Sequence, residues 1–209
     1  MTDQRAQIMW TGGVPASTLY DDPYYSLEDG PAETRHVFLR GNGLPERFAA
    51  GFHISELGFG TGLNLLVALS AARGAGALPL RYTAFEAHPM GADDMTRALR
   101  AFPALAEDAS WLVRAWAQGP RIETAELRAE VILGDARRTL PEWCGKAEAW
   151  FLDGFAPARN PELWEPSLLA EVARHTAPGG TAATYTAAGQ VRRALEAAGF
   201  AVERRTGYG

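Results

Sequence analysis

The 209-residue sequence has one cysteine, one lysine and no long hydrophobic run. The lone Cys144 excludes an internal disulfide and a zinc site built from clustered cysteines. The best apolar stretch, 63–72, is broken by Asn64 and Ser70 and is shorter than the roughly 18 residues of a membrane span. The first ten residues lack the hydrophobic core and the cleavage site of a secretory signal, so we expect a soluble, cytoplasmic protein.

The charge balance is mildly acidic, with 20 basic and 25 acidic residues and a formal net charge of −5. This balance argues against sequence-independent binding of nucleic acid through bulk charge. Every basic residue except Lys146 is an arginine, which has two open explanations: genomic base composition, or recognition of phosphate by guanidinium groups. The four histidines show no metal-ligand spacing, so no metal site is predicted: His36, His53, His88 and His175.

The apolar content of 47% and the length predict one globular domain in two parts. Residues 1–50 read as an irregular, aromatic-rich N-terminal extension with one short helix, and 51–209 as the catalytic domain. In the second part, strand patterns cover 52–57, 80–85, 121–127, 131–133, 149–152, 181–186 and 200–206, and helix patterns cover 61–73, 92–102, 105–116, 161–175 and 189–198. This alternation predicts a mostly parallel, doubly wound α/β sheet that binds its ligand at the carboxyl ends of the strands.

The strongest motif is ELGFGTGLN, residues 56–64, between a predicted strand and a helix. Gly58 and Gly60 fit the first two positions of the dinucleotide fingerprint, but Leu63 occupies the third, and the lysine of a P-loop is absent. Glycines at this spacing after an acid are typical of S-adenosylmethionine enzymes with a Rossmann-like fold, although a plain tight turn remains an alternative. The residues that we predict to bind the cofactor here are Glu56, Gly58, Phe59, Gly60, Thr61, Gly62 and Asn64.

Three acids end neighbouring strands of the predicted sheet. We expect Glu86 to accept both ribose hydroxyls, Asp135 beside Ala136 to accept from the adenine amine, and Asp153 to lie at the sheet's edge. Taken singly, each acid is also a candidate helix cap or solvated loop residue. For Asp153 we favour a functional role, because Asn160 before Pro161 is the better predicted helix cap.

The strings ELGFGTGLN (56–64) and FLDGFAPARNPELW (151–164) resemble the methyltransferase domain of bifunctional tRNA wobble-uridine enzymes of the MnmC family and their stand-alone relatives. The stretches at 21–26, 33–48 and 184–200 resemble this family as well, so the resemblance runs from about residue 20 to the end. It implies the class I methyltransferase fold, S-adenosyl-L-methionine as cofactor, and methylation of 5-aminomethyl-2-thiouridine to 5-methylaminomethyl-2-thiouridine in the tRNA anticodon loop. The FAD-dependent oxidase half has no room in 209 residues, so a separate oxidase would act upstream.

In this reaction an alkylammonium must lose a proton before its nitrogen accepts the methyl group, because its pKa resembles the value of about 10.4 for lysine. We therefore predict Asp153 as the group that orients the amine and takes its proton, and Phe155 as a face on which the uracil stacks. Aromatic packing by Tyr20 and Tyr24 on the base, and phosphate contacts from Arg159, Arg192 and Arg193, complete the predicted substrate site. Trp164 is predicted to pack in the core behind this loop.

Relatives continue after the final GYG with a basic run, and a strand at 200–206 would lack its usual antiparallel neighbour here. We therefore expect this sequence to be a truncated form with an incomplete last strand. Two other functions stay open: methylation of a small-molecule amine, which the acidic net charge fits, and a non-catalytic partner subunit that binds the cofactor weakly.

Overall fold

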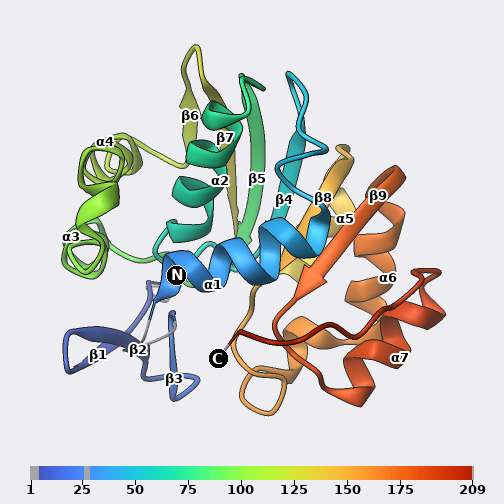
Figure 1. Cartoon of the computed structure of the whole chain (residues 1–209). Helices are drawn as coiled ribbons and strands as arrows, with labels where there is room; N and C mark the ends of the chain where they lie inside the picture. The colour runs from blue at the N-terminus through green and yellow to red at the C-terminus, as the bar shows by residue number, and fades with distance from the viewer. Residues whose placement is uncertain (1–4, 26–28, 209) are drawn as a thin grey trace.

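The computed structural model describes residues 5–25 and 29–208 and centres on a six-stranded sheet (Figure 1). The strand order is β6-β7-β5-β4-β8-β9, in which all neighbours are parallel except β6 and β7. The strands are β4 (His53–Leu57), β5 (Leu80–Glu86), β6 (Arg121–Glu123), β7 (Leu127–Leu133), β8 (Ala147–Leu152) and β9 (Thr176–Thr184). The predicted doubly wound sheet is therefore confirmed, and the strands predicted over 121–127 and 131–133 are present as the antiparallel pair β6 and β7, with boundaries shifted by a few residues.

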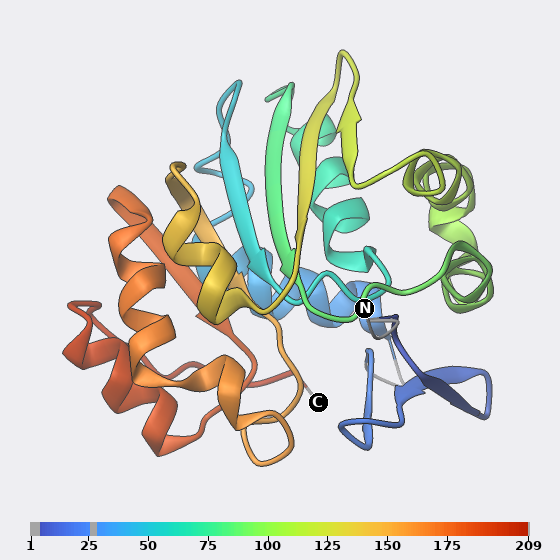
Figure 2. The same cartoon turned by 180° about the vertical axis from the view of Figure 1, so that it is seen from behind.

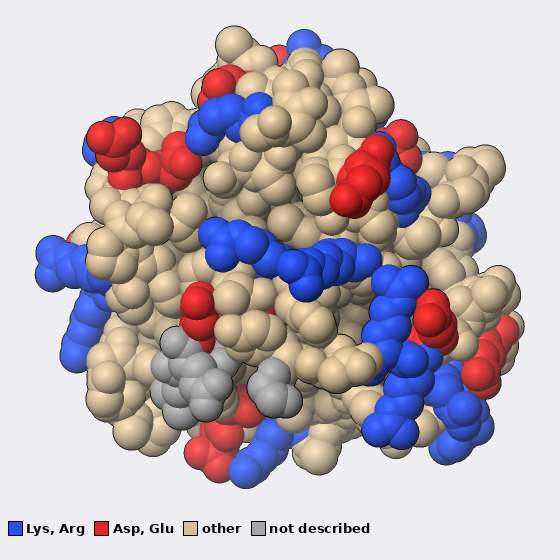
Figure 3. Space-filling view, in the orientation of Figure 1, with Lys and Arg blue, Asp and Glu red and all other residues tan. Residues whose placement is uncertain are grey.

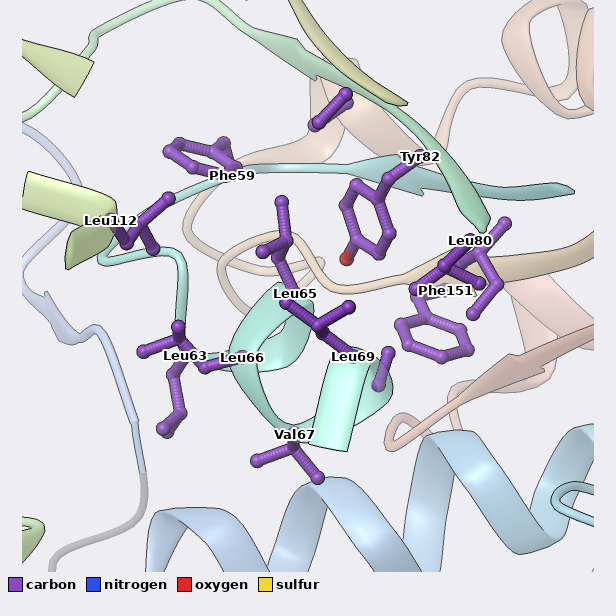
Figure 4. Close-up of a cluster of buried hydrophobic side chains, with 14 of the residues drawn as sticks. Phe59, Leu63, Leu65, Leu66, Val67, Leu69, Leu80, Tyr82, Leu112 and Phe151 are labelled. Atoms are coloured by element: carbon purple, nitrogen blue, oxygen red, sulfur yellow. The ribbon is translucent and has the colours of Figure 1, made fainter. Parts of the chain in front are cut away.

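Helices cover both faces of the sheet (Figures 1 and 2). One face carries α2 (Leu63–Gly74), α3 (Ala92–Leu99) and α4 (Ala106–Trp116), and the other carries α5 (Ala136–Glu142), α6 (Pro166–Arg174) and α7 (Gly189–Ala197). Side chains of a strand alternate between the two faces, so Phe151 joins the first core while Trp150 and Leu152 join the second. Figure 4 shows the first core, where leucines of α2 pack against Tyr82 and Phe151.

The N-terminal part has more regular structure than the sequence analysis predicted. Strands β1 (Ile8–Thr11), β2 (Val14–Ser17) and β3 (Asp22–Pro23) form a small antiparallel sheet. The turn between β1 and β2 is Gly12-Gly13, both with positive φ, and this pair was an available hairpin signal. A helical segment follows: α1 (Gly30–Thr34), the π-helical η1 (Arg35–Leu39) and the 3₁₀ turn η2 (Arg40–Asn42).

Three predictions about the last third of the chain were wrong. The helix expected over 161–175 is split into η4 (Pro161–Trp164) and α6, because Glu165 is extended before Pro166. The strand expected over 181–186 begins at Thr176 instead, so β9 includes Pro178-Gly179-Gly180, where the ladder with β8 has an irregularity. Residues 200–206 form no strand: Phe200 and Val202 pack on the second core, and Arg205 donates to the Arg40 carbonyl oxygen, so side-chain anchoring replaces a ladder.

Strands β4, β5, β7 and β8 run parallel, so their carboxyl ends meet at one edge of the sheet. Helix α1 crosses this edge on one side, and the β1–β3 sheet lies beyond it (Figure 1). Among the described residues, no helix is both long and apolar enough to cross a membrane.

Candidate active site

A cavity of about 970 Å³ opens at the carboxyl ends of the parallel strands. Its floor is formed by the glycine turn after β4 and the residues that follow β5, β7 and β8, and its walls by α1, η1 and the N-terminal segment. Of the residues predicted from the sequence, those that line it are Tyr20, Tyr24, Gly58, Phe59, Gly60, Thr61, Asn64, Glu86, Asp135, Ala136, Asp153 and Phe155. Residues of the N-terminal segment and of the loop after β8 thus share one site.

The glycine turn requires its glycines. Gly58, Gly60 and Gly62 all have positive φ, a region that other residues rarely adopt. A Cβ atom at Gly58 would also overlap the backbone carbonyl oxygen of Asp153. The absence of a side chain therefore lets the ends of β4 and β8 approach, and it places the turn next to Asp153.

Glu86 holds the turn from the neighbouring strand. Its Oε2 accepts hydrogen bonds from the backbone N–H groups of Phe59 (2.9 Å) and Gly60 (3.0 Å), and its Oε1 accepts from that of His88 (2.7 Å). Burial raises the pKa of Glu86, while these N–H donors oppose that rise. The carboxylate is thus fixed at the cavity floor by three backbone donors.

Asp135 is a helix cap that also lines the cavity. It begins α5, accepts from the Arg137 backbone N–H at 2.9 Å, and forms an ion pair of 2.6 Å with the Arg137 guanidinium. Its hydrogen bonds from this side chain hold the pKa of Asp135 below its ordinary value. The helix cap, one of the two roles expected for Asp135, is therefore present, and the adenine contact stays a prediction.

Asn64 connects two carboxyl groups at the base of the cavity. Its Nδ2 donates to Asp153 Oδ2 at 2.6 Å and to Glu56 Oε1 at 2.7 Å, while its Oδ1 accepts from the Thr34 hydroxyl at 2.7 Å. The two carboxyl oxygens accept hydrogen bonds and so favour the NH₂ end of the amide, while the Thr34 hydroxyl, which also lies 3.1 Å from the Gly30 carbonyl oxygen, contacts the other end. Glu56 also accepts from the Tyr82 hydroxyl at 2.8 Å.

The two acids joined by Asn64 have raised pKa values. Burial raises the pKa of Asp153 to about 7, with the charge of Glu33 adding to the shift and the Asn64 hydrogen bond opposing it. Burial, together with the charge of Asp153, raises the pKa of Glu56 well above its ordinary range. A carboxyl group with a pKa near 7 at a cavity is suited to proton transfer at neutral pH.

Aromatic rings from the N-terminal segment surround Phe155. The ring centroids of Tyr20 and Tyr24 lie 4.8 and 5.1 Å from that of Phe155. The indole N–H of Trp164 donates to the Phe155 carbonyl oxygen at 2.8 Å, and Trp164 is buried, as predicted. Asp22 Oδ2 accepts from the backbone N–H of Ala156 at 2.8 Å, so the N-terminal segment holds the loop after β8.

Five of the residues proposed for the site do not line the cavity. Glu56 is fully buried behind Asn64, and Gly62 packs against Leu112 and Phe59. Arg159 forms a 2.9 Å ion pair with Asp21, and Arg192 and Arg193 are exposed on α7. Asn160 occupies the N-cap position of η4, as predicted, but its side chain makes no capping hydrogen bond, and the residue contributes to the cavity wall.

The sequence analysis missed several residues of the cavity wall. Glu33 and Thr34 come from a helix in a region interpreted as largely irregular, so no strand-end rule pointed to them. Tyr185 follows β9 directly and donates to the Gly154 carbonyl oxygen at 2.9 Å; its place near the end of the strand predicted over 181–186 was a usable signal. Tyr208 reaches the cavity from the C-terminal segment, where a strand was expected.

The cavity fits a cationic, nucleoside-containing ligand. Its volume lies within the range of roughly 300–1,000 Å³ for small-molecule sites. Carboxyl groups of Glu33, Glu86 and Asp153 contribute to its lining, and such groups pair with sulfonium and ammonium charges. Gly58 and Gly60 of the turn line the cavity together with these acids, so backbone atoms form part of its floor. No group of three or more potential metal ligands occurs in the described part of the chain.

Comparison with known proteins agrees with this geometry. A family model described as S-adenosyl-L-methionine-dependent methyltransferase matches residues 104–209. The chain is 45% identical to the "tRNA 5-methylaminomethyl-2-thiouridine biosynthesis bifunctional protein MnmC" of Caulobacter sp. strain K31, over 100% of this chain and 38% of that protein. It is 44% identical to the protein of the same name from Pseudomonas aeruginosa strain UCBPP-PA14, over 99% of this chain and 34% of that protein.

The chain therefore spans about a third of the length of these curated relatives. Among solved structures, MnmC2 from Aquifex aeolicus is similar with a TM-score of 0.78 and 26% identity, over 95% of this chain and 65% of that one. The family model matches half of the sequence, and its cofactor suits the acidic cavity at the strand ends. The chain belongs to the S-adenosyl-L-methionine-dependent methyltransferase family.

Proposed function

We propose that the protein transfers a methyl group from S-adenosyl-L-methionine to the primary amine of 5-aminomethyl-2-thiouridine at the wobble position of tRNA. The names of the relatives with 44–45% identity support this substrate. The observation that carries the proposal is that a single cavity joins the glycine turn, the Asp153 carboxyl group and the Phe155 aromatic cluster. Cofactor, proton acceptor and base platform would thus share one space.

The residues that would hold the cofactor are on the floor of the cavity. The turn at 58–62 offers backbone for close approach, Glu86 offers a carboxylate for ribose hydroxyls, and Asp135 with Ala136 borders the position for the adenine. When bound, the cofactor supplies an electrophilic methyl group on a positively charged sulfur.

Asp153 accepts the proton of the substrate amine. Its Oδ2 is held by Asn64, while Oδ1 receives no hydrogen bond from the residues that the structure describes. A free oxygen can accept an N–H of the incoming aminomethyl group and orient the nitrogen lone pair. Once that proton has passed on to water, the ionised carboxylate also stabilises the positive charge that develops on nitrogen as the methyl group arrives.

Phe155, Tyr20 and Tyr24 provide a platform for the modified base. Phe155 is two residues from Asp153, so a base stacked on this cluster would carry its C5 substituent toward the carboxylate. In this proposal residues 1–50 are an extension that completes the active site of the catalytic domain at 51–209. Arg159 stabilises the loop through Asp21, while Arg192 and Arg193 remain proposed phosphate contacts.

The test is methyl transfer to tRNA from cells that lack the modification, with nucleoside analysis by mass spectrometry. We expect 5-methylaminomethyl-2-thiouridine in the tRNA, and far less product from the free aminomethyl nucleoside. Equal activity on the nucleoside would favour the small-molecule amine as the substrate. Titration with S-adenosylhomocysteine by calorimetry is the control, since absence of binding up to millimolar ligand would favour the non-catalytic subunit.

The curated relatives are named as bifunctional proteins, and this chain matches about a third of the length of such a protein. We propose that a separate FAD-dependent oxidase acts upstream and supplies the free aminomethyl group. Addition of such an oxidase should raise the yield on tRNA that carries the unprocessed side chain, and should leave the yield on the aminomethyl form unchanged.

A further inference from the structure

The helical segment that forms one wall of the cavity also carries exposed arginines. Thr34 and Phe38 are buried and line the cavity, whereas Arg35 and Arg40 of the same segment are exposed. Figure 3 shows a band of basic side chains crossing the molecule over this segment and continuing beside it. Basic groups therefore lie directly outside the cavity wall.

The C-terminal segment extends this band and ends at the cavity. Arg205 donates from Nη1 to the Arg40 carbonyl oxygen at 3.2 Å, and the neighbouring Arg204 is exposed. The His36 ring is hydrogen-bonded through Nε2 to the Thr206 carbonyl oxygen at 2.9 Å. We call Arg35, Arg40, Arg204 and Arg205 the basic strip, and the segment that carries its last two members reaches the cavity mouth at Tyr208.

Most arginines of the basic strip form no ion pair with a carboxylate of the described residues. Among residues 5–25 and 29–208, Arg205 is ion-paired with Glu203 at 3.1 Å, and the other three strip arginines form no ion pair. Six arginines elsewhere are paired with carboxylates, namely Arg73, Arg121, Arg128, Arg137, Arg159 and Arg174. In a chain with a net charge of −5, unpaired guanidinium groups beside a cavity mark a surface for an anionic partner.

Two exposed aromatic rings lie where the basic strip meets the cavity. Tyr185 and Tyr208 are 39% and 37% exposed, and both line the cavity. Exposed rings beside guanidinium groups favour single-stranded nucleic acid over an acidic protein surface, because each base presents a face for stacking and each phosphate an acceptor pair.

We propose that the basic strip, together with Tyr185 and Tyr208, is a docking surface for the single-stranded loop of an RNA. The arginines hold backbone phosphates on one side of the methylated nucleotide, and the two tyrosines stack on its neighbouring bases. This inference rests on the proposed function, since it assigns the place where the rest of the RNA lies when one nucleotide enters the cavity. It adds residues that the predicted arginine contacts did not include.

The experiment measures binding without methyl transfer. An end-labelled RNA hairpin is titrated with protein and followed by fluorescence anisotropy over a range of salt concentrations. The R35A/R40A variant should bind on the order of tenfold more weakly at low salt, and the slope of log affinity against log salt should fall by about 0.7–0.9 for each lost phosphate contact. The matched control is R81A/R114A, which removes two exposed, unpaired arginines that lie outside the cavity lining.

A second variant tests the aromatic part. Y208A should weaken binding at least about fivefold, the lower end for loss of one base–aromatic stack, and should leave the salt slope unchanged. Tyr208 is exposed at the end of a segment without regular structure, so its removal should not disturb folding, which the thermal midpoint checks.

Wild-type affinity and salt slope in R35A/R40A, or an equal loss in R81A/R114A, would overturn the inference. Retained RNA binding in R35A/R40A with weakened binding of polyglutamate would assign the basic strip to an acidic protein instead. The proposed function fails separately: a protein that binds the hairpin through the strip but methylates no tRNA contradicts the function and leaves the docking surface supported.

Discussion

The floor of the cavity is held by hydrogen bonds between neighbouring strand ends, whereas its cover is held by contacts between distant and more exposed segments. On the floor, Glu86 and Asn64 bind partners on adjacent strands at 2.6–3.0 Å. In the cover, Asp21 pairs with Arg159 at 2.9 Å, and both side chains are at least half exposed. Exposed ion pairs contribute little free energy, so the floor should tolerate substitution far less than the cover.

The largest effect is expected at Asp153 on the floor. D153N keeps the shape of the side chain and removes the proton acceptor, so kcat should fall on the order of 10²–10⁴-fold. Single-turnover methyl transfer to tRNA measures this loss, with S-adenosylhomocysteine affinity as the control for an intact site. A loss below threefold would show that another group takes the proton.

The pH dependence tests the same carboxyl group without substitution. Because the pKa of Asp153 is raised to about 7, the group is protonated below that pH and loses its acceptor. The rate should therefore fall about tenfold per pH unit below 7, or roughly a hundredfold by pH 5, and should level off above 7. A flat profile between pH 5 and 8 in single-turnover assays would contradict this assignment.

The next largest effect is expected at Gly58, where the ends of β4 and β8 approach each other closely. G58A places a side chain on a backbone with φ of +89° and brings the new Cβ into overlap with the Asp153 carbonyl oxygen. The free energy of unfolding should therefore fall by about 1–3 kcal/mol. G76A is the matched control, because φ is +66° there and no atom would lie within 4 Å of the new Cβ. Urea denaturation compares the two, and equal losses would mean that the contact between the strand ends is unimportant.

A smaller effect is expected where Thr34 orients Asn64. T34V removes the hydroxyl that contacts the Asn64 amide oxygen, so Asn64 should hold the ionised Asp153 less firmly and the midpoint of the pH profile should move upward. The rate at pH 7 should fall by less than about tenfold, and T34S should restore both values. An unchanged midpoint in T34V would limit Thr34 to packing.

The smallest effect is expected in the cover. R159A breaks the pair with Asp21, which is worth about 0–1 kcal/mol, so the thermal midpoint should barely move. Since Asp22 and the Phe155 rings still hold the loop, KM for tRNA should rise only a few-fold and kcat should stay the same. A loss comparable to that of D153N would remove the distinction between floor and cover.

The floor was easier to predict than the cover for a physical reason. Glu86, Asp135 and Asp153 each follow an apolar strand, and parallel strands bring such positions to one edge, so local pattern fixes their place. Residues of the cover come together through tertiary contacts that no local periodicity encodes. Thr34 and Tyr208 were missed for this reason, whereas Tyr185 and the N-terminal sheet were missed although the predicted strand at 181–186 and the Gly12-Gly13 pair were usable signals.

The C-terminal error has a similar origin. The apolar alternation at 200–206 is that of a strand, but a ladder needs a neighbouring edge, and sequence alone does not supply one. Phe200 and Val202 use the alternation to pack on the second core, while Arg205 and Thr206 bond to the helical segment. The alternation therefore predicted the buried side chains of this segment correctly, but it predicted strand hydrogen bonds that the segment does not form.

The hydrogen bond from Ala156 to Asp22 spans 134 positions of the chain, whereas that from Phe59 to Glu86 spans 27. During synthesis on the ribosome, the glycine turn can meet Glu86 soon after both have emerged. The loop after β8 must wait for its own translation before it meets a segment made near the start. The contact between the N-terminal segment and the loop after β8 therefore forms later than the contact between the glycine turn and Glu86.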